Sequence, residues 1–240
     1  MISEAQKQQM AEAVARIRAT MAEAARRAGR DPAEVSLCAA CKTRTVEEVR
    51  YSADLPIDLF GENHVQELVE KNDAGAYNGK PGHFIGHLQT NKVNKVVGRA
   101  ALIQSVDSTR LLDKIDAAAA RLGLTQDILI EINIGAEESK SGVGPDDLWP
   151  LLEAAAAREH LQVRGLMAIP PADADDDQTR RFFARMRELL AEAAARQYEH
   201  TRMDILSMGM SHDYAMAIEE GATIVRVGTA IYGARDYSKK

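Results

Sequence analysis

Short apolar segments alternate with longer segments of helical periodicity along most of this chain. Short apolar runs are typical of buried β-strands, and apolar residues recurring every three or four positions are typical of amphipathic helices. Eight strands are predicted in this way, at residues 35–41, 57–61, 83–86, 101–106, 128–133, 163–169, 203–208 and 222–227. The chain therefore belongs to the α/β class.

The strict alternation of strands and helices predicts βαβ units and a parallel sheet. Eight such units without a recognisable linker favour a closed (β/α)8 TIM-type barrel over residues 35–237, within a single domain that covers residues 1–240. A doubly wound open sheet is the alternative. No G-x-G-x-x-G or Walker A sequence follows any predicted strand, which argues against a dinucleotide or nucleoside triphosphate site.

Residues 1–30 predict one extra helix in front of the barrel. Ser3 with Gln6 forms a capping-box pattern at its start, and Gly29 followed by Pro32 is a stop signal. Its apolar stripe consists of Met10, Val14, Ile17 and Met21.

Further capping patterns mark helix starts inside the predicted barrel. Thr45 with Glu48 fits a capping box, and Asn63 with Gln66 resembles one. The acidic stretch 173–177 leads into a helix start, where negative charge is favourable. Long helices are expected at 108–122, 146–158 and 176–196.

The charge balance restricts the partners. Thirty basic and 36 acidic residues give a net charge of −6, which argues against nucleic-acid binding. No apolar run reaches the roughly 18 residues of a membrane helix, and the N-terminus lacks the apolar core of a signal peptide. We therefore expect a cytoplasmic protein with no nucleic-acid or membrane partner, and a monomer, because nothing in the sequence demands an oligomer.

The two cysteines, Cys38 and Cys41, form a C-x-x-C sequence. A redox C-x-x-C sits at a helix N-terminus, whereas this one lies inside a predicted strand. Residues three apart on a strand point to opposite faces, and the six histidines are too scattered to complete a zinc site. Two inert thiols are the favoured interpretation.

Polar residues and glycines follow the carboxyl ends of most predicted strands. In a barrel these ends form one rim, where active sites lie. The residues expected there are Lys42, Thr43, Glu62, Asn63, His87, Gln89, Asn91, Asp107, Ser108, Asn133, Ser207–Ser211 and Arg226–Thr229.

The last two loops of the rim have the composition of a phosphate site. Barrels often bind phosphate with the loops after strands seven and eight and with a helix N-terminus. Gly209 and Gly228 allow close approach of the main chain, and Ser211 and Thr229 add hydroxyl groups at predicted helix starts. Helix capping without a ligand is the alternative.

Arg226 and Lys42 are charged residues in apolar surroundings. Arg226 interrupts the last strand, and a buried guanidinium needs an acceptor, which is either a carboxylate such as Glu131 or a bound ligand. Lys42 ends the first strand. It is either a surface lysine or a desolvated amine with a lowered pKa that acts as a nucleophile.

Six motifs together resemble the pyridoxal phosphate homeostasis proteins of the YggS/PROSC type, in order from about Val35 to Tyr237. They are Cys41-Lys42-Thr43, Gly61-Glu62-Asn63, the segment 83–92 (HFIGHLQTNK), Gly165-Leu166-Met167, the segment 206–211 (LSMGMS) and the segment 225–235 (VRVGTAIYGAR). Two positions depart from the family pattern: Cys41 replaces a serine, and His87 replaces a proline.

The resemblance implies a barrel like the N-terminal domain of alanine racemase, with pyridoxal 5′-phosphate held on Lys42 as an internal aldimine. It further implies roles for two groups of residues. Asn63 would line the pocket near the ring, and Arg226 would face the pyridine nitrogen. The phosphate would be cradled by Ser211, Gly228 and Thr229, beside the turn of Ser207, Met208 and Gly209.

These implied roles favour a binding protein over an enzyme. An arginine can only donate a hydrogen bond, so Arg226 would favour an unprotonated ring, which is a weaker electron sink. The extra C-terminal domain that supplies a second acid/base in alanine racemase is not expected here. The predicted function is a carrier or regulator in vitamin B6 homeostasis, with little or no catalysis, that delivers the cofactor to PLP-dependent apo-enzymes. A minimal amino-acid racemase is the alternative, and a Schiff-base aldolase is a third hypothesis.

Overall fold

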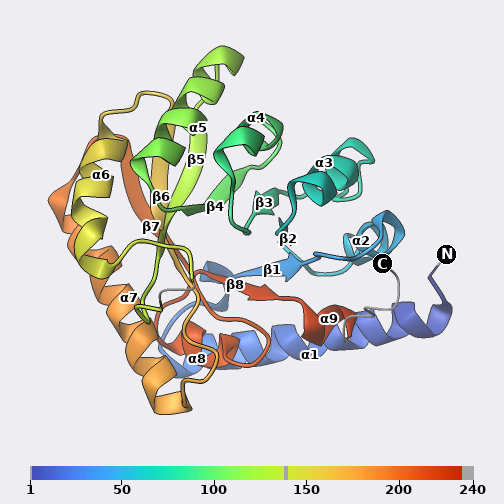
Figure 1. Ribbon diagram of the computed structural model, residues 1–240. Coiled ribbons are helices and arrows are strands. Elements are labelled where there is room, and N and C mark those ends of the chain that lie inside the picture. The colour runs from blue at the N-terminus through green and yellow to red at the C-terminus, as the bar shows by residue number, and fades with distance from the viewer. Residues whose placement is uncertain (1, 138–139, 234–240) are drawn as a thin grey trace.

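The computed structural model describes residues 2–137 and 140–233. Eight parallel strands form a closed barrel in sequential order, and β8 pairs with β1 (Figure 1). The predicted barrel is confirmed and the open sheet is excluded. The last residues of the predicted barrel, 234–237, lie outside the described residues. The strands are β1 (Ser36–Ala40), β2 (Leu59–Glu62), β3 (Gly82–Phe84), β4 (Leu102–Val106), β5 (Gln126–Ile132), β6 (Leu161–Ala168), β7 (Thr201–Ser207) and β8 (Ile224–Val227).

Helices cover the outside of the barrel. They are α1 (Glu4–Arg27), α2 (Val46–Ser52), α3 (Val65–Asp73), α4 (Val93–Val96), α5 (Thr109–Leu122), α6 (Leu148–Ala156), α7 (Asp176–Arg196), α8 (Tyr214–Glu219) and α9 (Thr229–Tyr232). Short 3-10 turns lie at η1 (Pro32–Glu34), η2 (Thr90–Lys92) and η3 (Pro145–Asp147). Among the described residues, no helix is long and apolar enough to cross a membrane.

The hydrophobic core has two parts, because alternate residues of each strand face the barrel interior and the helices. The larger part lies between strands and helices and contains Cys41 and Phe60. The smaller part fills the barrel and contains Cys38 and Leu59. Cys38 and Cys41 are buried, unpaired with each other and in different parts of the core, so the predicted opposite orientation is confirmed.

Helix α1 lies along the outside of the barrel and packs against α8 and α9 (Figure 1). The predicted capping box of Ser3 and Gln6 is present. Beyond the helix, Arg30 donates from Nη1 to the carbonyl oxygens of Ile218 and Ala222, at 2.8 and 2.9 Å. The extra helix therefore stabilises the segment that leads into β8.

Of the other capping predictions, two are confirmed and one is wrong. The box of Thr45 and Glu48 caps α2 as expected, and Asp175, inside the acidic stretch, caps α7. The box predicted for Asn63 and Gln66 is wrong, because α3 begins one residue later, after His64, and has no side-chain cap. The Asn63 side chain is thereby left for another role.

Candidate functional site

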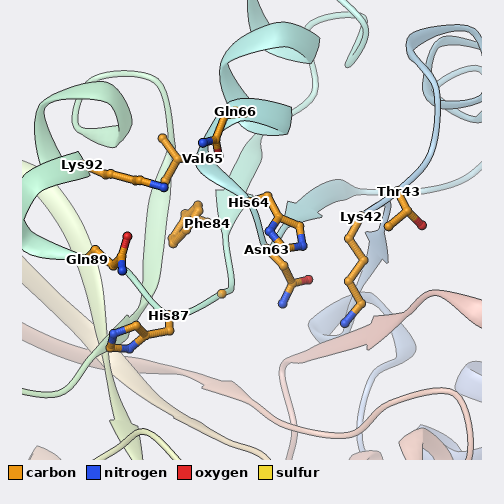
Figure 2. Close-up of a pocket in the computed structure, with 11 residues that line it drawn as sticks. Lys42, Thr43, Asn63, His64, Val65, Gln66, Phe84, His87, Gln89 and Lys92 are labelled. Carbon is orange, nitrogen blue, oxygen red and sulfur yellow. The ribbon is translucent and has the colours of Figure 1, made fainter. Parts of the chain in front are cut away.

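A cavity of about 500 Å³ opens at the carboxyl ends of β1, β2 and β3 (Figure 2). Lys42 and Asn63 both lie in it, and their side chains point toward the same space. This is the rim where barrel active sites are built. The cavity is lined by Lys42, Thr43, Asn63, His64, Val65, Gln66, Phe84, Gly86, His87, Gln89 and Lys92.

Lys42 lies in a tight turn after β1 that is fixed by hydrogen bonds to side chains of α3. Strand β1 ends at Ala40, and Thr43 adopts a φ of 65°, which is unusual for a residue other than glycine. The N–H of Thr43 donates to Oε2 of Glu67 at 2.7 Å, and the carbonyl oxygen of Cys41 accepts from Nζ of Lys71 at 2.7 Å. Both residues that flank Lys42 are therefore anchored by charged side chains of α3.

The anchor continues into a buried polar cluster. Nζ of Lys71 lies 2.7 Å from Oε1 of Glu62, which also accepts from Sγ of Cys41 at 2.8 Å and from the hydroxyl of Tyr77 at 3.4 Å. We expected Glu62 on the rim, but it is the last residue of β2 and shares the outward-facing parity of Phe60. Its place is under the Lys42 turn and not in the cavity.

Burial controls the charges of this cluster. Burial raises the pKa of Glu62, and the neighbouring Lys71 ammonium offsets that effect only in part. For Lys71, burial opposes the charge, but the surrounding groups, including the carboxylates of Glu62 and Glu67, raise its pKa above the ordinary value. Lys71 is therefore charged at neutral pH.

Asn63 presents an unsatisfied acceptor. Its Oδ1 is buried and has no hydrogen-bond partner among the described residues. A Cβ at Gly86 would lie 2.2 Å from the carbonyl oxygen of Asn63, so only glycine lets the loop after β3 pack this closely. Because buried acceptors are normally paired, this amide oxygen points to a ligand with a donor group.

The loops after β7 and β8 bring the predicted phosphate-binding residues together. Oγ1 of Thr229 lies 3.1 Å from Oγ of Ser211, and the N–H of Ala230 donates to that Oγ at 3.4 Å. Thr229 begins α9 as expected. Ser211 does not begin α8, because it lies in the turn three residues before Tyr214.

Glycines set the position of these loops. Gly209 has a φ of 89°, and its Cβ would lie 2.5 Å from that of Ala217. A Cβ at Gly228 would lie 3.0 Å from the carbonyl oxygen of Ala40, so this loop is adjacent to the end of β1, two residues before Lys42. Met208 packs its side chain into the core between barrel and helices, which leaves only its main chain for a ligand.

Arg226 lies inside the barrel at the head of a hydrogen-bond chain. Its Nη1 donates to Oγ of Ser207 at 2.6 Å, and its Nη2 donates to the carbonyl oxygen of Ala168 at 3.0 Å. Ser207 then donates to Oε1 of Gln104 at 2.6 Å, and Nε2 of Gln104 lies 2.9 Å from Nδ1 of His83. Because Oε1 of Gln104 accepts from Ser207, its Nε2 faces His83, and since this NH2 group can only donate, His83 accepts at Nδ1. Burial lowers the pKa of His83 to about 4, so this histidine is neutral.

The ion pair between Arg226 and Glu131 is not formed. Among the described residues, no carboxylate lies within 4.0 Å of Arg226, and its charge is met by neutral oxygens. Burial raises the pKa of Glu131 to about 7, and Asp107 adds to the increase, while Arg226 opposes it from a distance. Of the two acceptors that the sequence left open, a carboxylate such as Glu131 or a bound ligand, the carboxylate is not used, and Ser207 and Ala168 accept instead.

The sequence did not predict Lys71 as the partner of Glu62, or Gln104 and His83 as members of the Arg226 hydrogen-bond chain. Two of these three residues have a recognisable pattern in the sequence. Lys71 lies three residues after Leu68 on the buried face of α3, and Gln104 interrupts an apolar strand. His87 is on the rim as expected, where its Nδ1 lies 3.2 Å from Oγ of Ser141.

The comparisons with known proteins agree with this architecture. The family described as alanine racemase, N-terminal domain, matches residues 6–236. A relative from Aquifex aeolicus named pyridoxal phosphate homeostasis protein is 42% identical over 94% of this chain and 98% of its own length.

Two solved structures show the same fold. PipY of Synechococcus elongatus, solved with PLP bound, is 32% identical, with a TM-score of 0.80 over 93% of this chain and 100% of PipY. Alanine racemase of Streptomyces lavendulae is 22% identical, with a TM-score of 0.74 over 93% of this chain and 57% of the racemase, which is a likeness of fold alone. By sequence and by fold, this chain belongs to the pyridoxal phosphate homeostasis protein family, built on the alanine racemase N-terminal barrel.

Proposed function

We propose that this chain binds pyridoxal 5′-phosphate through a Schiff base between the aldehyde of the cofactor and Nζ of Lys42. The bond forms by condensation of amine and aldehyde with loss of water. The observation that carries the proposal is the placement of Lys42 in a cavity beside the unpaired acceptor of Asn63, next to the loop of Gly228. The bound PLP of the related PipY supports it.

The residues present fit such a cofactor. The hydroxyls of Ser211 and Thr229 and the tight Gly228 loop would hold the phosphate, with the Ser207–Gly209 segment beside them. The Asn63 oxygen would accept from a donor near the ring. When bound, the cofactor supplies a reactive aldehyde and an electron-accepting ring.

Arg226 favours storage over catalysis. It is buried, it is already held by Ser207 and Ala168, and it has only donors to offer to a ring nitrogen. A donor at that nitrogen favours the unprotonated ring, which withdraws electrons weakly. We infer a monomeric, single-domain carrier in the cytoplasm that keeps the aldehyde masked and passes it to PLP-dependent apo-enzymes. A minimal racemase is the second candidate, because Lys42 could also act as a base.

An absorption spectrum tests the attachment. The purified protein, loaded with pyridoxal phosphate, should show a visible band that borohydride bleaches, and mass spectrometry should place the reduced adduct on Lys42. Lys42→Ala should lose the band. Lys92→Ala is the matched control, because Lys92 lines the same cavity from the opposite side (Figure 2) and should keep it. A protein that stays colourless would refute the attachment.

A second measurement separates carrier from racemase. Incubation of the loaded protein with single L-amino acids in deuterium oxide should give no exchange of the α-proton, and mixing with a PLP-dependent apo-enzyme should restore the activity of that enzyme. Rapid exchange that Lys42→Ala abolishes would replace the carrier proposal with the racemase.

A further inference from the structure

A second concave site, outside the cavity of Lys42, is lined by residues of η2, α4 and α5. The helices α4 and α5 are neighbours on the outside of the barrel (Figure 1). This α4–α5 groove has a volume of about 390 Å³. Three cations line it, together with three uncharged polar side chains. These residues are Arg110, Lys114 and Arg121, with Thr90, Asn91 and Asn94.

The cations occupy one face of α5. Arg110, Lys114 and Arg121 are spaced by four and seven residues, which places them along a single side of the helix. The acidic residue Asp113 of the same helix forms its ion pair elsewhere, with Arg158 at 2.6 Å. Helix α5 thus separates its charges and directs the positive ones into the groove.

This arrangement is unfavourable for the isolated helix in two ways. Arg110 is the second residue of α5, where a positive charge opposes the helix dipole. Arg110 and Lys114 are also like charges at positions i and i+4, which repel each other. The first turn of α5 contains no acidic residue that could offset the charge of Arg110. A negative charge in the groove would relieve both costs.

No carboxylate of the described residues pairs with Arg110, Lys114 or Arg121. Two arginines on other faces show the usual pairing: Arg180 contacts two glutamates, and Arg164 contacts two aspartates. In the described part of the chain, neither Arg110 nor Lys114 has a carboxylate within 4.0 Å, and Arg121 donates only to the amide oxygen of Asn94. In a protein of net charge −6, this is a local excess of unneutralised positive charge.

We propose that the α4–α5 groove binds the phosphate group of a small phosphate monoester. A dianion would balance the charges of Arg110 and Lys114, which lie one helical turn apart, and guanidinium groups suit phosphate geometry in particular. The amides of Asn91 and Asn94 and the hydroxyl of Thr90 add neutral donors. The volume is within the range of small-molecule sites, roughly 300–1,000 Å³, and a concave groove suits a compact ligand.

The groove adjoins the first cavity. Turn η2 separates the two: Thr90 and Asn91 line the groove, and Lys92 lines the cavity of Lys42. A ligand in the groove would therefore contact the segment that forms one wall of the other site. Binding in the groove does not require the Lys42 proposal, because the two sites share no charged residue.

Nuclear magnetic resonance of the full chain tests the proposal. Inorganic phosphate and pyridoxine 5′-phosphate, which has no aldehyde, are titrated at constant ionic strength into the wild type and two double variants. R110Q/K114Q removes two groove cations, and R16Q/R26Q removes two exposed arginines of α1 as a charge-matched control. The amides of α5, which does not line the cavity of Lys42, should shift and saturate in the wild type and the control, and not in R110Q/K114Q.

The two probes identify the source of the phosphate. Saturation at a lower concentration of pyridoxine 5′-phosphate supports a phosphate ester as the ligand, whereas equal saturation supports free phosphate. No saturable shift, or an equal shift in R110Q/K114Q, would overturn the proposal. Without phosphate at low salt, R110Q/K114Q should be at least as stable as the control, and a lower melting temperature would assign the cations a structural role instead. Lys42→Ala should leave the groove titration unchanged.

Discussion

Replacing Lys71 with methionine tests the buried anchor beneath Lys42. Lys71 is 1% exposed and contacts Glu62, Glu67 and the carbonyl oxygen of Cys41. Methionine is apolar and unbranched, so the change removes the charge and leaves the Glu62 carboxylate buried without its cation. Removing one partner of a buried ion pair costs about 3–5 kcal/mol. For a chain of this size, that corresponds to a fall in Tm of about 6–20 °C.

The loss depends on pH in a defined direction. Burial raises the pKa of Glu62, so the ionised carboxylate is the unfavourable form in the folded state. The Glu62 side chain therefore contributes its full stability below the unfolded pKa of 4.5, where it is protonated. That contribution is lost as the pH rises through the higher pKa of the folded state. Without Lys71 that folded value rises further, so the deficit of Lys71→Met should be smaller under acidic than under alkaline conditions.

Chemical denaturation followed by circular dichroism measures this effect. Glu62→Gln combined with Lys71→Met should recover most of the lost stability, because no buried charge remains. Lys95→Met, at an exposed lysine of α4, is the control and should change the free energy of unfolding by less than about 0.5 kcal/mol. A loss below about 1 kcal/mol in Lys71→Met, or a double variant no better than the single one, would contradict the reasoning.

Three further predictions follow from single residues. Glu131, with a pKa raised to about 7, contributes stability that is complete below pH 4.5 and lost as the pH rises through 7. The wild type should therefore lose about 3 kcal/mol relative to Glu131→Gln between these limits, and parallel stability–pH curves would contradict this. Gly165→Ala should lower the free energy of unfolding, measured by urea denaturation, by about 3 kcal/mol or more. The reason is that φ of Gly165 is 149° and a Cβ there would lie 1.9 Å from the carbonyl oxygen of Ile205. An unchanged denaturation midpoint would refute this prediction. Cys38 and Cys41 should resist Ellman's reagent in the folded protein. Burial raises the pKa of Cys38 to about 12 and that of Cys41 well above its usual value, so neither forms the reactive thiolate. Fast labelling would contradict this prediction, because it would show an exposed thiol.

The local signals in the sequence were reliable where the physics is local. Capping boxes need only residues three apart, and those of Ser3 and Thr45 form as predicted. The apolar periods likewise predicted all eight strands of the barrel. The box predicted for Asn63 is wrong, because α3 begins after His64, one residue later than the pattern indicates.

The long-range partners were decided by the closed barrel. Arg226 and Ser207 are 19 residues apart, and Ser207 and Gln104 are 103 apart, yet one hydrogen-bond chain joins them inside the barrel. The sequence predicted that a buried arginine needs an acceptor and offered a carboxylate such as Glu131 or a bound ligand, whereas the structure supplies Ser207 and Ala168. The choice among acceptors depends on strand register, and register is a property of the closed sheet.

The sequence alone determined the elements, the barrel class and the positions of Lys42, Asn63 and the two glycine loops at the strand ends, because periodicity and strand polarity are encoded residue by residue. Only the tertiary structure decided that Glu62 turns away from the rim to form the anchor with Lys71, and that α5 directs its cations into a groove with α4. The physical reason is that burial and ion pairing depend on which surfaces the closed barrel brings together, and residues far apart in the chain gain or lose partners only when it closes.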